Sequence, residues 1–91
     1  MVIAKRYLIS GRVQGVGYRF FAEREANRLS IRGYVKNLPN GDVEAYAIGT
    51  ENALSEFKRR LKEGPRGAYV TRVEETEQPI DRDYDHFVIA T

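Results

Sequence analysis

Ser10-Gly11-Arg12-Val13-Gln14-Gly15-Val16-Gly17-Tyr18-Arg19 is the stretch around which this sequence is organised. It follows an apolar, β-branched run that ends at Ile9, and it leads into a segment with helical periodicity. Glycines between a strand and a helix let backbone N–H groups converge, and the start of a helix adds partial positive charge. Arg19 adds a full charge on a planar fork of donors. The stretch therefore predicts a cradle for an anion, with an ordinary glycine-rich turn and a surface Arg19 as the alternative.

The whole chain predicts five strands and two helices, counting the strand and the helix on either side of the glycine-rich stretch. The expected strands are Val2 to Val13, Ile31 to Leu38, Val43 to Gly49, one within Gly67 to Glu77, and His86 to Thr91. The expected helices are Tyr18 to Leu29 and a segment that starts at Thr50 or Asn52 and ends before Gly64-Pro65. The order predicts an α+β fold, a ferredoxin-like split β-α-β sandwich with both helices on one face of an antiparallel sheet. Its strand order should be 4-1-3-2, with the short fifth strand extending an edge.

Two residues of the first helix break its expected pattern. The apolar face is formed by Tyr18, Ala22, Ala26 and Leu29. Glu25 falls inside that face, and since buried carboxylates are usually paired, we expect a partly buried ion pair with Arg28 or with a strand arginine. Phe20 points to the opposite side. Phe20 and Tyr46 are candidate exposed contact residues, and the expected state is a monomer or weak homo-oligomer.

Length and composition exclude several classes of function. The 91 residues predict one domain, residues 1–91, and 42% hydrophobic with 31% charged residues is typical of a globular chain. There is no cysteine and one histidine, His86, so a thiol nucleophile or a metal site built from Cys and His is not expected. The net charge of +2 is too small to argue for nucleic acid. No apolar run reaches the roughly 18 residues of a membrane span, so the expected location is the cytoplasm, without a membrane partner.

Asn37 is the second candidate site residue. In the split β-α-β topology the first two strands run in the same direction, so their carboxyl ends lie at one edge of the sheet. Asn37 and Arg19 should therefore face one pocket. The alternative is that Asn37 only caps the turn that begins with Leu38-Pro39-Asn40-Gly41, which is ordinary turn chemistry.

Two motifs resemble those of the acylphosphatase family. The first is Ile9-Ser10-Gly11-Arg12-Val13-Gln14-Gly15-Val16-Gly17-Tyr18-Arg19, and the second is Gly33-Tyr34-Val35-Lys36-Asn37-Leu38-Pro39-Asn40-Gly41. The resemblance covers essentially the whole chain. It implies hydrolysis of a small acyl phosphate to a carboxylate and phosphate, with neither metal nor cofactor. It also implies that Arg19 binds the phosphoryl group, that Asn37 orients the attacking water, and that the amides of Gly15, Val16, Gly17 and Tyr18 complete the cradle. Tyr18 stands where the family more often has Phe. Its ring should still pack on the first helix, and the largest expected effect is a hydroxyl placed near the pocket.

The residues themselves favour the same substrate. Phosphoryl transfer depends mainly on positioning and charge stabilisation. The leaving group of an acyl phosphate is a carboxylate, whose pKa is about 4–5 by analogy with carboxyl side chains, so it needs no acid to protonate it.

Two other classes of function remain as alternatives. RNA-recognition domains share the element order, although their aromatic motif belongs on the third strand. A non-catalytic acylphosphatase-like domain, like that of hydrogenase-maturation proteins, is the other, and the end of the chain at Thr91 favours the free-standing enzyme.

Overall fold

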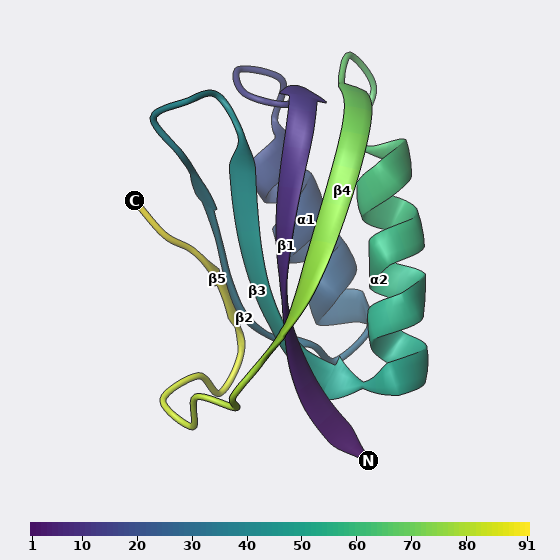
Figure 1. Ribbon diagram of the computed structural model, residues 1–91, viewed down its shortest axis with the longest axis vertical. Helices are drawn as coiled ribbons and strands as arrows, with labels where there is room; N and C mark the ends of the chain where they lie inside the picture. The colour runs from purple at the N-terminus through teal and green to yellow at the C-terminus, as the bar shows by residue number, and fades with distance from the viewer.

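The computed structural model describes residues 1–91 and packs two helices on one face of a five-stranded sheet (Figure 1). The strands are β1 (Val2–Arg12), β2 (Arg32–Asn37), β3 (Val43–Thr50), β4 (Tyr69–Gln78) and β5 (Phe87–Ile89). The helices are α1 (Tyr18–Arg28) and α2 (Glu51–Glu63). Neither helix has the length and apolar composition needed to cross a lipid bilayer.

The sheet has the order β4-β1-β3-β2-β5, which confirms the predicted ferredoxin-like topology. β1 pairs antiparallel with both β3 and β4, and β2 pairs antiparallel with β3. β5 extends the β2 edge in the parallel direction, with Gly33 opposite Phe87, so the complete sheet is mixed. Because β1 and β2 run in the same direction, the β1–α1 loop and the β2–β3 hairpin lie at the same end of the molecule (Figure 1).

The main core lies between the sheet and the helices. Alternation along β3 sends Val43, Ala45 and Ala47 into this core, whereas Tyr46 and Ile48 face the other side of the sheet, as their spacing predicts. α2 contributes its predicted stripe of Leu54, Phe57 and Leu61. The same helix begins at Thr50, whose side-chain oxygen accepts a 3.1 Å hydrogen bond from the Ala53 amide.

Tyr46 is buried, so the expectation of an exposed contact residue is wrong for it. Only 8% of Tyr46 is exposed, because the segment after β4 folds over its ring. The Tyr46 hydroxyl donates to the carbonyl of Pro79 at 2.6 Å and accepts from the Asp81 amide at 2.7 Å. The rings of Tyr34 and Tyr84 pack against it, with centroids 5.6 and 6.0 Å away. This cover also removes the open aromatic face on which an RNA-recognition domain stacks bases.

Glu25 is buried in ion pairs, but its main partner is not the one expected. The Arg60 guanidinium of α2 donates to Glu25 at 2.7 Å, Arg28 lies 3.6 Å away, and no strand arginine takes part. Burial alone would raise the pKa of Glu25. Hydrogen bonds from Arg24 and Arg60, together with the charge of Arg28, lower that pKa below its ordinary value. The carboxylate therefore links the two helices as an anion.

Candidate functional site

The loop between β1 and α1 leaves the first amides of the helix without a side-chain partner. Gly17 precedes the helix with φ of 76°, and no side chain caps the N-terminus of α1. Gly15 has the same φ of 76°. A Cβ at either glycine would meet nothing within 4 Å, so it is the left-handed backbone, and not crowding, that favours glycine here. The unpaired amides and the helix dipole together favour an anion in front of α1.

A cavity of about 130 Å³ opens beside this loop. Its lining consists of Val13, Gly15, Gly17, Tyr18, Arg19, Phe20 and Asn37. The structure thus brings Arg19 and Asn37, which are 18 positions apart in the sequence, to one cavity at the sheet edge where the topology predicts it. Of the expected loop residues, Val16 is not part of the lining, and its side chain packs against the main core.

Asn37 carries a buried side-chain oxygen that has no hydrogen-bond partner. The following turn is closed without it: the Leu38 amide donates to the Asp42 carbonyl at 2.8 Å, and the Asp42 amide donates to the Asn40 side chain at 3.0 Å. The turn-capping alternative for Asn37 is therefore not supported. A buried acceptor without a partner costs free energy in the folded protein, which is typical of a group kept for a ligand or a bound water.

Gln14 holds the two halves of the site together. Its side-chain amide nitrogen donates to the carbonyl oxygens of Leu38 and Asp42, both at 2.8 Å. The loop that leads to Arg19 is thereby fixed to the hairpin that follows Asn37. Sequence reasoning missed this residue, although a long amide side chain within a loop of glycines and valines is itself a signal of a tertiary hydrogen bond.

The Tyr18 hydroxyl, for which a place near the pocket was open, is held by a carbonyl of α2. The hydroxyl donates a 2.6 Å hydrogen bond to the carbonyl of Leu61, near the end of α2, and the ring packs against Phe21. Burial raises the pKa of Tyr18, so the phenol stays neutral at physiological pH. Tyr18 thus anchors the start of α1 to the core.

The cavity contains one full charge. Arg19 takes part in none of the ion pairs of the protein, and the lining contains no carboxylate and no imidazole. An unpaired guanidinium beside converging amides gives a cationic cavity that fits a small anion with several acceptor oxygens.

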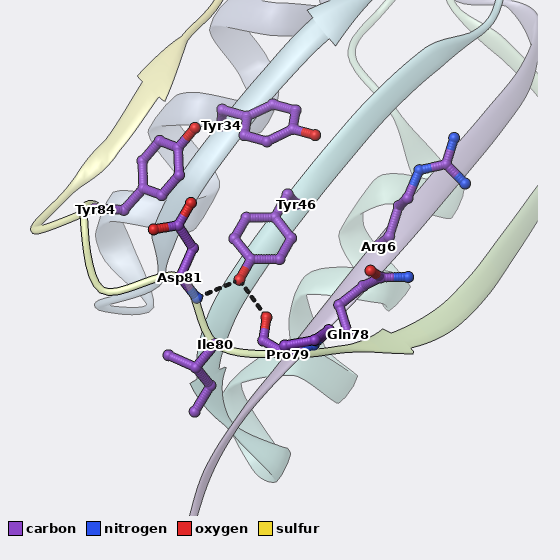
Figure 2. A pocket seen from close by; sticks show the side chains of 8 residues that line it. All are labelled: Arg6, Tyr34, Tyr46, Gln78, Pro79, Ile80, Asp81 and Tyr84. Carbon is purple, nitrogen blue, oxygen red and sulfur yellow. Dashed lines mark hydrogen bonds between the residues drawn. The ribbon is translucent and has the colours of Figure 1, made fainter.

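A larger cavity of about 360 Å³ lies on the opposite face of the sheet (Figure 2). The rings of Tyr34, Tyr46 and Tyr84 line it together with Arg6. Three of its polar side chains already have partners, since Arg6 and Tyr34 both donate to Glu44, and the Tyr46 hydroxyl donates to the carbonyl of Pro79. Its one cationic side chain, Arg6, is paired with Glu44, whereas Arg19 is unpaired, so the smaller cavity at the glycine loop is the candidate functional site.

The structure is a ferredoxin-like α+β protein with a cationic cavity between its first strand and first helix. The sequence profile of the acylphosphatase family matches residues 5–89, and the chain belongs to this family. An acylphosphatase of Solibacter usitatus is 49% identical over 94% of this chain and 88% of its own length. One of Archaeoglobus fulgidus is 46% identical over 98% of this chain and 99% of its own.

Solved structures agree with this assignment. The acylphosphatase of Bacillus subtilis superposes with a TM-score of 0.93 at 38% identity, and the match covers both chains completely. Full-length HypF in its phosphate- and nucleotide-bound form matches this whole chain with 12% of its own length, at a TM-score of 0.88 and 26% identity. The family and the fold confirm the predicted enzyme class, an acylphosphatase acting on small acyl phosphates.

Proposed function

We propose that the cavity beside the glycine loop binds the phosphoryl group of an acyl phosphate, which is hydrolysed by direct in-line attack of water without a metal ion. The observation that carries this proposal is the unpartnered, buried side-chain oxygen of Asn37 in the same cavity as Arg19. One group can hold an anion, and the other can hold a water molecule next to it.

Binding of the phosphoryl group rests on fixed donors. Arg19 offers two parallel N–H groups to the non-bridging oxygens, and the amides from Gly15 to Tyr18 supply further donors at the start of α1. These donors belong to a loop that Gln14 ties to the hairpin, so little reorganisation is needed when charge develops on the phosphoryl oxygens.

Asn37 orients the attacking water. Its side-chain oxygen accepts a hydrogen bond from the water, but an amide does not take up a proton at neutral pH. The water oxygen forms a bond to phosphorus while the bond from phosphorus to the acyl oxygen breaks. The proton of the water goes to a phosphate oxygen, and the acyl group leaves as a carboxylate. The contribution of Asn37 is thus positional, which is worth several orders of magnitude when geometry is well fixed.

The lining of the cavity selects the leaving group. It includes no side chain able to protonate an alkoxide, and no carboxylate or imidazole to hold a divalent cation. A carboxylate leaves unprotonated and is less basic than a phenolate or an alkoxide, so acyl phosphates should react far faster than aryl phosphate esters, and alkyl phosphate esters should not react.

The direct test compares benzoyl phosphate with p-nitrophenyl phosphate, each with and without EDTA. We expect benzoyl phosphate to be hydrolysed far faster than p-nitrophenyl phosphate, at a rate that EDTA does not change. A loss of activity on chelation that Mg²⁺ restores would overturn the metal-independent mechanism. Equal rates on the two substrates would overturn the leaving-group argument.

A further inference from the structure

The cavity is small and lies next to an exposed apolar side chain. Its volume is about 130 Å³, and the proposed function places the phosphoryl group and the attacking water there, beside Arg19 and Asn37. In an in-line attack the acyl group leaves on the side of phosphorus opposite the water, so it extends from the phosphoryl group toward the rest of the lining.

Phe20 is the one residue of the lining that is both large and mostly exposed. It is 72% exposed, whereas Val13 and Tyr18, the other large apolar residues of the lining, are buried. Helical side chains lean toward the N-terminus of their helix, so a residue in the first turn of α1 leans toward the glycine loop. The Phe20 ring takes part in no aromatic pair and packs against neither apolar cluster of the protein.

We propose that Phe20 is the contact for the acyl group and makes the enzyme prefer acyl phosphates with an apolar, above all an aryl, acyl group. This inference rests on the proposed function, because it needs the phosphoryl group to occupy the cavity beside Arg19. An aryl ring packed on the Phe20 ring at the cavity mouth gains an aromatic contact that an acetyl group is too small to make. A small or charged acyl group gains little there.

The test measures kcat/KM for benzoyl phosphate and for acetyl phosphate in the wild type and in Phe20→Ala, Phe20→Leu and Tyr69→Ala. Tyr69 is a matched control, since it is 71% exposed but does not line the cavity. In each protein we take the ratio of kcat/KM for benzoyl phosphate to kcat/KM for acetyl phosphate. The intrinsic difference in reactivity between the substrates cancels when this ratio is compared between a variant and the wild type. We expect this ratio to fall roughly 3- to 10-fold in Phe20→Ala, less in Phe20→Leu, and not at all in Tyr69→Ala.

Inhibition by inorganic phosphate separates an acyl contact from damage to the cavity. Phosphate has no acyl group, so its inhibition constant should be the same in Phe20→Ala and in the wild type. An unchanged substrate ratio in Phe20→Ala, in a wild type that hydrolyses both substrates, would overturn the specificity proposal and leave the proposed function standing. A wild type that hydrolyses neither substrate would overturn the proposed function, and this inference with it.

Discussion

The side-chain amide of Gln14 donates a 2.8 Å hydrogen bond to the carbonyl oxygen of Leu38. A second bond of the same length reaches the Asp42 carbonyl. These two bonds connect the loop before Arg19 to the hairpin that follows Asn37, and the two proposed site residues belong to different elements. Gln14 therefore helps to fix the distance between Arg19 and Asn37, the groups proposed to bind the phosphoryl group and the water, although it has no part in the proposed chemistry.

Replacing Gln14 should damage both stability and activity. Gln14→Met keeps the length of the side chain but removes the donor, so the carbonyl oxygens of Leu38 and Asp42 each lose one of their two hydrogen bonds. We expect the free energy of unfolding in urea to fall by about 1–3 kcal/mol. We expect kcat/KM for benzoyl phosphate to fall roughly 10- to 100-fold, because the loop is no longer fixed to the hairpin.

The control is Gln78→Met, since the Gln78 side chain lies on the other face of the sheet, beside the larger cavity (Figure 2). It should retain both properties. If Gln14→Met lost stability but kept full activity, Gln14 would hold the fold together without positioning the site.

The fold could be predicted from the sequence because each helix, strand and turn carries its own local signal. Glycines mark the β1–α1 loop, Pro39-Asn40-Gly41-Asp42 marks the hairpin, and the stripe in α2 has helical spacing. The prediction that Arg19 and Asn37 line one pocket followed from topology, since β1 and β2 run in the same direction and end at the same edge of the sheet. The role of Gln14 did not follow, because a hydrogen bond between a side chain and a distant carbonyl depends on three-dimensional register and leaves no periodic pattern.

Arg19 should be essential for activity and dispensable for folding. In the proposed mechanism Arg19→Ala removes a bidentate charged contact to the phosphoryl group, which should cost roughly 2–5 kcal/mol in the transition state, or about 30- to several-thousand-fold in kcat/KM. Inhibition by inorganic phosphate should weaken as well. Because Arg19 makes no ion pair in the folded protein, the free energy of unfolding should change by no more than about 0.5 kcal/mol.

A suitable control is Arg66→Ala, which removes one positive charge from the loop between α2 and β4, at a residue that does not line the cavity. It should hydrolyse benzoyl phosphate like the wild type. Comparable activity in the two variants would mean that net charge, and not a contact to the phosphoryl group, explains the effect.

Asn37 and Asn40 should show opposite effects, although they are three positions apart. Asn37→Ala removes a buried oxygen that has no partner, so stability should be retained or should rise by about 1 kcal/mol. Its kcat should fall strongly with little change in KM, since Asn37 is proposed to act on the water and not on the bound substrate. Asn40→Ala breaks the hydrogen bond from the Asp42 amide, so it should lose stability and keep kcat. An Asn37→Ala variant with normal kcat and a raised KM would assign Asn37 to substrate binding instead.

The main partner of Glu25 and the burial of Tyr46 could not be predicted from the sequence, and the reason is the same for both. Both depend on segments that are distant in the sequence: Arg60 lies 35 positions from Glu25, and Pro79 lies 33 positions from Tyr46. The periodicity of α1 showed that Glu25 is buried, but it could not show which arginine α2 brings to it. The direction of β5 was open for the same reason, since three residues carry no signal for parallel or antiparallel pairing.

Stability should fall in acid, and Glu25 should contribute to that fall. The pKa of Glu25 is lowered in the folded protein from its ordinary value of 4.5, although burial opposes the shift, because Arg24 and Arg60 donate to the ionised carboxylate. A carboxyl group with a lowered pKa in the folded state stabilises the protein at pH values above its unfolded pKa, and the contribution disappears as the pH falls through the folded pKa. Glu25→Gln should therefore cost about 1–3 kcal/mol in free energy of unfolding at pH 7, and this difference from the wild type should shrink steadily below pH 4.5.

Urea unfolding of both proteins from neutral to acid pH measures this difference directly. Glu23→Gln is the matched control, because Glu23 lies on the same helix and forms no ion pair, so its curve should run parallel to that of the wild type. Other glutamates with a lowered pKa, such as Glu44, act equally in all three proteins and cancel from the comparison. The free energy of unfolding of Glu25→Gln could instead stay parallel to that of the wild type down to the lowest pH. In that case the bond from Arg60 would contribute packing but no charge-dependent stability. The link between the two helices would then not depend on the ionisation of Glu25.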